Sequence, residues 1–302
     1  MALPIKVGLN IVWPRSELLV EFAQLAESLG FESVWSGEHV CLPARPDWWE
    51  LYPTAQMAKA AGEHFDEDMV AFKPDSAFLD PMTVLAHIAG ATSRIRLGIG
   101  IYLLALRDPI LVARTIASLD VLSGGRLDMA TGLGWTADEY TFTNNQWETR
   151  GRRTNEMIRC LRTLFAEEFP EFHGEFFDFP KIGFQPKPVQ QPRLPIHIGG
   201  ATPAAARRAA ALGDGWYGSG ARNVDDIVRD ELRKAGREHD ESFQFSAITL
   251  KGPLTRKELD QMAREGLHRV VVTPWPDTKV GEVGPEGLSQ LEAYAKAIGI
   301  NN

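Results

Sequence analysis

The stretch 95–134, IRLGIGIYLLALRDPILVARTIASLDVLSGGRLDMATGLG, contains the unit from which the fold can be predicted. An apolar run at 95–104 precedes a helical pattern that Asp108 caps and Pro109 opens, and a second apolar run follows at 125–134. Strand runs that are apolar almost throughout indicate a sheet buried on both faces. A helix between two such runs favours parallel pairing through a right-handed crossover. The stretch therefore predicts one β-α-β unit of a parallel sheet.

The same strand–helix unit recurs from one end of the chain to the other. Helical patterns alternate with further apolar runs at 5–10, 31–39, 195–200, 215–220, 243–250 and 268–275. About eight units in sequence predict an α/β fold, a (β/α)8 TIM barrel, with an open doubly wound sheet as the alternative. Such a barrel takes about 250 residues, so roughly 50 remain for insertions. We expect residues 1–302 to form a single barrel domain.

Two segments are candidates for those insertions. Residues 41–78, after the second strand, are rich in proline, tryptophan and charge, and we expect them to form a lid. Residues 171–193, before the fifth strand, alternate aromatic residues with prolines, which suggests an edge hairpin.

Composition excludes several classes of function. The net charge of -8 argues against a protein that binds nucleic acid through a broad basic face. No apolar run approaches the roughly 18 residues of a membrane span, and the first residues lack a signal pattern. Cys41 and Cys160 are far apart and lack metal-ligand spacing. We therefore expect a cytoplasmic protein with reduced thiols and with neither nucleic-acid nor membrane partners.

In a barrel, the active site lies at the C-terminal ends of the strands, and here these ends are rich in glycine. Glycine leaves room for a flat ligand and lets backbone amides approach it. The candidate positions are Asn10, Glu38, His39, Gly100, Ile101, Gly132, Gly134, Trp135, Gly199, Gly200, Ala201 and Thr202.

Residues 199–203 can be interpreted in two ways. Thr202 is a good N-cap and Pro203 a good first helical residue, so a helix should begin here with free amides at the mouth. Such a terminus can hold a phosphate. It can equally be an ordinary tight turn, since the GxGxxG spacing and the P-loop lysine, which would favour a phosphate site, are both lacking. Arg150, Arg152 and Arg153, at the start of another helix, suggest an anionic partner or simply a solvated face.

His39 is the one histidine that stands at a strand end beside an acid, Glu38. It is a candidate proton donor, with a structural histidine as the alternative. No HxH, HExxH or histidine–carboxylate cluster occurs, so we expect no metal site, and no GxSxG elbow is present. Trp135 could stack on a ring-shaped ligand or merely pack in its loop.

Several ordered motifs resemble the bacterial-luciferase-like family of barrel oxidoreductases, most closely its branch that uses the deazaflavin coenzyme F420. The resemblance covers roughly residues 5–220 and depends on AESLGFESVWSGEHV, DPMTVLAHIAGATSRIRLGIGI, RDPILVARTIASLDVLSGGRLDMATGLGW, RGRRTNEMI, GEFFDF…QPKPVQ and PIHIGG…RAAALGDGW. The last third of the chain matches the family only in its strand–helix rhythm.

The resemblance implies a role for each candidate. His39, with Glu38, lies near the reactive centre of the cofactor ring, and Gly100–Ile101 forms a bulge, often with a cis peptide, under one face of it. The ring and its linker are lined by Gly132, Gly134 and Trp135. Residues 199–202 contact the phosphate of the cofactor, and Arg150 or Arg153 helps to bind its acidic tail. Some deazaflavin enzymes of the family carry a glutamate proton donor where this chain has Trp135.

The resemblance thus implies an F420-dependent oxidoreductase that passes a hydride to or from a small, apolar organic substrate. One alternative is an FMN-dependent monooxygenase whose reduced flavin comes from a partner reductase, and another is a flavin-binding protein without catalysis. A reductase acting in trans and a homodimer are expected from kinship only.

Overall fold

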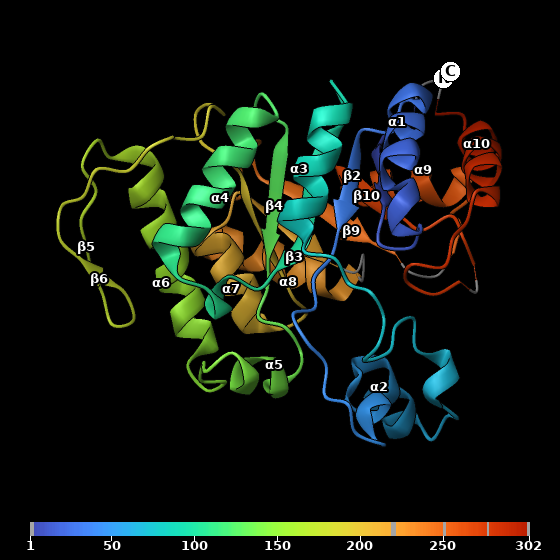
Figure 1. Cartoon of the computed structure of the whole chain (residues 1–302), viewed down its shortest axis with the longest axis horizontal. Helices are drawn as coiled ribbons and strands as arrows, with labels where there is room; N and C mark the ends of the chain where they lie inside the picture. The colour runs from blue at the N-terminus through green and yellow to red at the C-terminus, as the bar shows by residue number, and fades with distance from the viewer. Residues whose placement is uncertain (1–2, 219–221, 250–251, 277, 301–302) are drawn as a thin grey trace.

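A computed structural model describes residues 3–218, 222–249, 252–276 and 278–300. Its helices and strands alternate as the sequence predicts (Figure 1). They are β1 (Lys6–Asn10), α1 (Leu19–Leu29), β2 (Ser33–Ser36), α2 (Pro53–Ala61), α3 (Pro81–Ala91), β3 (Arg96–Tyr102), α4 (Pro109–Leu122), β4 (Leu127–Thr131), α5 (Ala137–Phe142), α6 (Arg150–Ala166), β5 (Phe172–His173), β6 (Asp178–Phe179), β7 (Ile196–Gly199), α7 (Pro203–Leu212), β8 (Gly215–Gly218), α8 (Arg222–Lys234), β9 (Gln244–Ile248), α9 (Arg256–Arg264), β10 (Arg269–Val272) and α10 (Glu286–Ile298).

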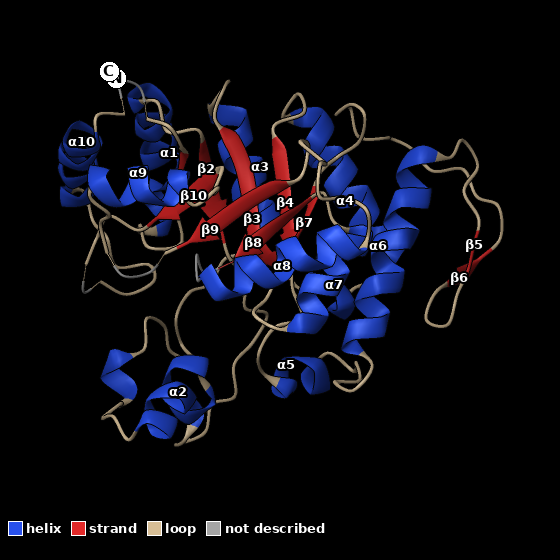
Figure 2. Ribbon diagram, turned by 180° about the vertical axis from the view of Figure 1, so that it is seen from behind, coloured by secondary structure: helices blue, strands red, loops and turns tan. Residues whose placement is uncertain are grey.

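The large sheet closes into a barrel of parallel strands in the order β1-β10-β9-β8-β7-β4-β3-β2 (Figure 2). Because β1 pairs with both β10 and β2, the sheet has no free edge, and the doubly wound alternative is wrong. The TIM barrel predicted from the sequence is confirmed. Ser219, Gly220 and Leu250, which the predicted strands 215–220 and 243–250 include, lie outside the described residues.

Large aromatic side chains fill the inside of the barrel. The rings of Trp35 and Tyr217 stack with their centroids 4.8 Å apart, and both side chains are almost fully buried. A Cβ atom added to Gly98 would overlap the Trp35 indole, and one added to Gly100 would overlap the Tyr217 ring. These two glycines therefore let the strands carry aromatic rings across the barrel axis.

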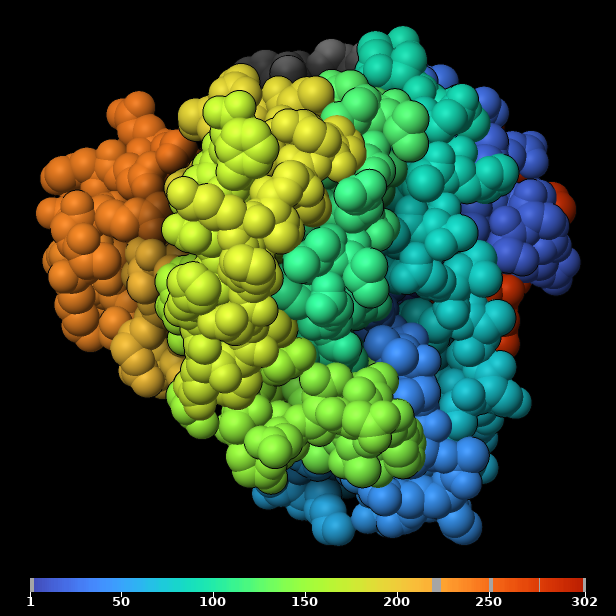
Figure 3. Space-filling view, turned by 60° about the vertical axis from the view of Figure 1, so that its left-hand side comes forward, coloured from blue at the N-terminus to red at the C-terminus, as the bar shows by residue number. Residues whose placement is uncertain are grey.

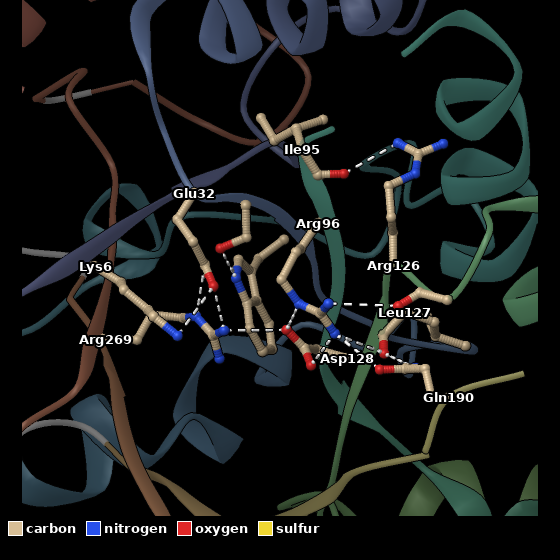
Figure 4. Close-up of polar contacts among 12 residues, drawn as sticks. Lys6, Glu32, Ile95, Arg96, Arg126, Leu127, Asp128, Gln190 and Arg269 are labelled. Atoms are coloured by element: carbon tan, nitrogen blue, oxygen red, sulfur yellow. Dashed lines mark hydrogen bonds and ion pairs between the residues drawn. The ribbon is translucent and has the colours of Figure 1, made fainter. Parts of the chain in front are cut away.

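A network of charged side chains forms the floor of the barrel, at the N-terminal ends of the strands (Figure 4). Arg269 donates to Glu32 and, over 3.1 Å, to Asp128, and Arg96 donates to Asp128 over 2.7 Å. Burial would raise the pKa of Asp128, but Arg269 and Arg96 outweigh it and hold that pKa at about 2. The N-terminal face of such barrels generally contributes to stability, and we assign that role to this charged network.

The two insertions occupy different parts of the molecule. Residues 41–78 contain α2 and lie beyond the C-terminal ends of the strands, on the same side as α5 (Figures 1 and 3). Residues 171–193 contain the antiparallel pair β5–β6, which confirms the predicted hairpin, and they lie on the outer side of α6. Only the first insertion can therefore cover the mouth.

Helix α5 was not expected from the sequence, because its six residues are too few to show a helical period. None of the helices in the described part of the chain is long and apolar enough to cross a membrane.

Candidate active site

A cavity of about 180 Å³ lies at the C-terminal end of the barrel. Its walls bring together many residues that the sequence predicts for the site, namely Asn10, Glu38, His39, Gly100, Ile101, Gly134 and Trp135. Tyr217, which sequence analysis did not select, is also in the wall. A larger cavity, of about 600 Å³, opens at the floor among residues such as Arg96 and Asp128, away from the mouth where barrels carry their chemistry.

The acidic neighbour of His39 in space is Glu139 of α5, and not the adjacent Glu38. His39 Nδ1 lies 3.4 Å from Glu139 Oε1, and the Glu139 side chain is completely buried. The same Oε1 accepts a hydrogen bond of 2.8 Å from the backbone amide of Val40. A buried carboxylate thus lies beside Nδ1 without a hydrogen bond to it, while the His39 ring also lines the cavity.

Glu38 turns away from His39 and binds the next strand instead. Its carboxylate forms an ion pair with Arg107 and accepts a hydrogen bond of 2.8 Å from the backbone amide of Leu103. Both contacts follow β3, so Glu38 fixes the loop between β3 and α4. This geometry gives Glu38 a structural part in the wall of the cavity, away from the His39 ring.

Aromatic rings surround His39 on three sides. Its ring centroid is 4.8 Å from that of Phe72, 5.4 Å from that of Phe78 and 5.3 Å from that of Trp135. We call these three residues the aromatic cage. Tyr52 supports the cage, because its ring lies 4.6 Å from Trp135 and its hydroxyl donates to the carbonyl oxygen of Phe72. Insertion 41–78 therefore contributes most of the apolar wall around His39.

The peptide bond between Gly100 and Ile101 is cis, and the pairing of β3 with β4 shifts at this point. The bulge that the family resemblance implies is therefore present. A Cβ added to Gly132 or to Gly199 would collide with the Ile101 side chain. These two glycines accommodate Ile101 directly, and they lie outside the lining of the cavity.

The turn from β7 to α7 has the predicted helix cap. Thr202 Oγ1 accepts a hydrogen bond of 3.2 Å from the amide of Ala205, and Pro203 is the first residue of α7. Gly200 has a φ of 140°, and an added Cβ would lie 2.8 Å from Cβ of Ala205. Gly200, Ala201 and Thr202 lie outside the lining of the cavity but on the same end of the barrel.

Three arginines gather near Tyr140, where α5, α6 and α7 meet. Arg150 and Arg153 belong to α6, and Arg208 belongs to α7. Burial raises the pKa of Tyr140 to about 12, and each of the three arginines acts in the opposite direction, which shows that all three lie near this ring. We call Arg150, Arg153 and Arg208 the arginine cluster. None of the three forms an ion pair with any residue that the structure describes, whereas Arg152 pairs with Glu175. The cluster therefore concentrates positive charge without a direct ion pair, although Glu156 and Asp108 act on Arg153 from a distance.

Local contacts hold the cluster in place. Arg208 donates to Asn155 Oδ1 and to the carbonyl of Gly151, which fixes α7 against the start of α6. Arg153 Nε donates to the carbonyl of Ala105 over 2.8 Å, and Arg150 stacks on the Trp147 ring. The Arg150 Nε atom is buried and makes no hydrogen bond to the described residues. The Nη1 atom of the same guanidinium donates to the carbonyl of Trp147 over 2.7 Å, so only part of the donor capacity of Arg150 is unsatisfied.

Sequence analysis missed three residues of this region. Glu139 stands three residues after Thr136, a spacing typical of a capping box, which hides its contact with His39. Arg208 lies inside an alanine-rich helix and gives no signal of its own. Tyr217 could have been found, because β8 reads GWYG and inward and outward positions alternate along a strand.

Among the described residues, no group of three or more His, Cys, Asp or Glu side chains is placed to hold a metal ion. The chemistry available at the mouth is therefore that of His39 with Glu139, an apolar cavity and the arginine cluster.

This chain matches a family model and is similar to individual proteins over most of its length. Residues 14–293 match the family model described as luciferase-like monooxygenase. An uncharacterised protein of Mycobacterium tuberculosis is 28% identical over 288 residues, which cover 92% of this chain and 93% of that protein. An FMNH2-dependent dimethylsulfone monooxygenase of Pseudomonas fluorescens is 31% identical over 263 residues, which cover 80% of this chain and 70% of that enzyme.

Among solved structures, an F420-dependent secondary alcohol dehydrogenase in complex with an F420-acetone adduct superposes with a TM-score of 0.70. The alignment covers 99% of both chains at 16% sequence identity, so it supports the fold alone.

Proposed function

Because this chain belongs to the luciferase-like monooxygenase family, whose members include F420-dependent and FMN-dependent enzymes, we propose that it is an F420-dependent oxidoreductase. In this proposal the enzyme passes a hydride between the deazaflavin and a small, apolar organic substrate. A reductase acting in trans would supply or remove the reducing equivalents.

The arginine cluster is the observation that carries the choice of cofactor. FMN ends in a single phosphate group, whereas F420 carries a phosphodiester and a chain of glutamates. Three arginines that form no direct ion pair with a described residue, one of them buried on α7, suit several negative charges spread along a tail better than one terminal phosphate. The amides of residues 199–202 at the start of α7 would hold the phosphate.

The cavity fits the ring of such a cofactor. The Tyr217 ring lies in the wall of the cavity, and its hydroxyl is buried without a hydrogen bond to the described residues. Asn10, Gly134 and Trp135 would form further walls, and Ile101 at the bulge would support one face. When bound, the deazaflavin supplies hydride transfer, and the protein supplies binding and orientation.

His39 would hold or move the proton that accompanies the reaction, at the ring edge that faces the cavity. The aromatic cage around His39 would exclude water from it. The cage also offers few polar groups to a substrate, and this favours the proposal that the substrate is apolar. With Trp135 at the position where some deazaflavin enzymes have a glutamate, His39 is the proton carrier on this side of the cavity.

One specific observation favours a second candidate. The relative that is 31% identical over 263 residues is named as an FMNH2-dependent monooxygenase, and this chain covers 70% of it. The same cavity would then serve reduced FMN and oxygen, with a partner reductase as the source of reduced flavin.

Titration of the purified protein with F420 and with FMN, followed by fluorescence of each cofactor, separates the two candidates. We expect F420 to bind at least tenfold more tightly than FMN, and tight binding of FMN alone would overturn the first candidate.

We call the arginine cluster together with residues 199–202 the cradle, and the variants Arg208→Met and Gly200→Asp test it. Arg208→Met removes a positive charge at similar length, and Gly200→Asp places a carboxylate at the start of α7, so both should weaken F420 binding by at least tenfold. Arg207→Met, on the exposed side of α7, is the matched control and should bind as the unaltered protein does. Unchanged affinity in Arg208→Met and Gly200→Asp would remove the cradle from the site.

A further inference from the structure

The carboxylate of Glu139 has an unusual environment for a buried acid. Its side chain has no solvent exposure, and one oxygen, Oε1, accepts the Val40 amide and faces His39 Nδ1. The other oxygen, Oε2, is buried without a hydrogen bond to the described residues. No lysine or arginine in the described part of the chain forms an ion pair with it. A buried carboxylate normally has a cationic partner or several amide donors.

His39 is the group that can compensate this charge. Its Nδ1 is buried, lies 3.4 Å from Glu139 Oε1 and makes no hydrogen bond to the described residues, while 13% of its side chain is exposed toward the cavity. The exposed edge is therefore the one that carries Nε2. A carboxylate beside one ring nitrogen favours the tautomer with the proton on that nitrogen, which leaves the other nitrogen to exchange protons.

The electrostatic influence of Glu139 reaches other groups at the mouth. Burial raises the pKa of the Cys41 thiol, and Glu139 adds to that rise. Burial also raises the pKa of the Tyr52 hydroxyl, again with a contribution from Glu139. Both groups therefore stay neutral and add no second negative charge beside the carboxylate.

We propose that Glu139 is a positioning residue that holds His39 in the form protonated at Nδ1 and so assigns proton transfer to Nε2. This proposal builds on the proposed function, in which His39 moves a proton. The proton that accompanies the reaction enters and leaves at Nε2, while the Nδ1 proton stays in place beside Glu139. When Nε2 is also protonated, the carboxylate stabilises the resulting imidazolium.

The arrangement depends on helix α5 and insertion 41–78 acting together. Glu139 is presented by α5, whose Tyr140 hydroxyl donates to the carbonyl of Leu133 over 2.8 Å. The cage residues Phe72 and Phe78 hold the imidazole ring from the side of insertion 41–78. The ring is thus fixed by packing on its faces and by the carboxylate at Nδ1.

Nitrogen-15 NMR of the histidine rings in the cofactor-free protein tests the tautomer directly. The His39 signals are assigned by their loss in His39→Gln. We expect the unaltered protein to show a proton at Nδ1, and Glu139→Met, which removes the acceptor, to shift the neutral ring toward the Nε2-protonated form. A His39 ring already protonated at Nε2 alone in the unaltered protein, or one unchanged in Glu139→Met, would overturn the proposal.

Kinetics with the bound cofactor provide the second measurement. Glu139→Gln keeps the shape and an acceptor oxygen but removes the charge, so kcat should fall about tenfold or more while KM changes little. Glu148→Gln, an exposed acid between α5 and α6, is the control. An unaltered kcat in Glu139→Gln would overturn the role in proton transfer. If no cofactor binds, the proposed function fails, and the NMR result still decides the tautomer.

Discussion

Glycine residues set the spacing of side chains inside this barrel. Gly98 on β3 faces the Trp35 indole, whose Nε1 donates to Ser33 Oγ over 2.8 Å, so the ring cannot move aside freely. Gly90 on α3 has the opposite environment, since nothing lies within 4 Å of a Cβ added there. The two positions therefore separate the packing cost of a methyl group from its effect on the backbone.

Substitution by alanine should have opposite effects at these two positions. Gly98→Ala should lower the free energy of unfolding by about 1–3 kcal/mol, because the methyl group overpacks the barrel. Gly90→Ala should raise it by about 0.5–1 kcal/mol, because alanine favours the helix. Urea unfolding of both variants measures the difference. A Gly98→Ala protein as stable as the parent would show that the indole can move.

At the scale of single residues, the sequence predicted which strand ends meet but not which side chains touch. His39 was found because it follows a strand, and Gly100–Ile101 because of the family motif. Glu38 was chosen as its acidic partner by adjacency, yet neighbouring residues at a strand end point in different directions. Glu139 is 100 positions further along the chain, and only the fold brings it to His39.

Helix α6 anchors the second insertion through one buried acid. Glu156 Oε1 accepts hydrogen bonds from the amides of Phe176 and Phe177, over 2.7 and 2.8 Å, and Oε2 accepts one of 2.9 Å from Glu175. Three backbone amides of the hairpin turn thus depend on a single carboxylate. The hairpin itself has only two paired residues in each strand.

Glu156→Gln should loosen this hairpin without unfolding the barrel. A glutamine side chain has one acceptor oxygen, so at least one of the three amides loses its partner, at a cost of about 1–3 kcal/mol. Limited proteolysis should then cut within residues 171–193 faster than in the parent. Glu171→Gln, an exposed acid at the edge of the same insertion, should leave the rate unchanged. Equal rates in Glu156→Gln and the parent would contradict this account.

The regular elements were predictable because their signals are local. Each barrel strand is an apolar run, and Asp80, Asp108 and Thr202 accept from amides of the first helical turn as their sequence context predicts. Helix α5 and the 3-10 turns at Trp48–Leu51 and Glu67–Met69 are too short for a period to appear. Their positions depend on tertiary contacts with the mouth of the barrel.

For the whole molecule, charge is separated between the two ends of the barrel. The floor pairs Arg269, Arg96, Glu32 and Asp128 with one another, whereas the arginine cluster at the other end has no paired acid among the described residues. The floor therefore serves stability, and it includes a buried neutral histidine, His197.

Stability should fall as the pH decreases from about 6.5 to about 4. Burial, helped by Arg269 and opposed by Asp128, lowers the pKa of His197 to about 4. Between these pH values the unfolded chain binds a proton that the folded protein does not, so acid favours unfolding. Urea unfolding at pH 7 and pH 5 should show a loss to which His197 contributes about 2 kcal/mol.

His197→Asn should reduce this loss, although His268, whose pKa burial also lowers, keeps part of it. An identical pH dependence in His197→Asn and the parent would show that His197 is not the responsible group.

The aromatic cage is supplied largely by residues 41–78, while the bulge, the arginine cluster and Glu139 belong to other segments. In the proposed function, substrate choice would therefore depend mainly on residues 41–78, and the groups that bind the cofactor tail and move the proton would lie on other segments. Insertion 41–78 is in effect an exchangeable cassette, and replacing it with the corresponding loop of a relative should retarget the enzyme to a new compound while its cofactor preference stays the same.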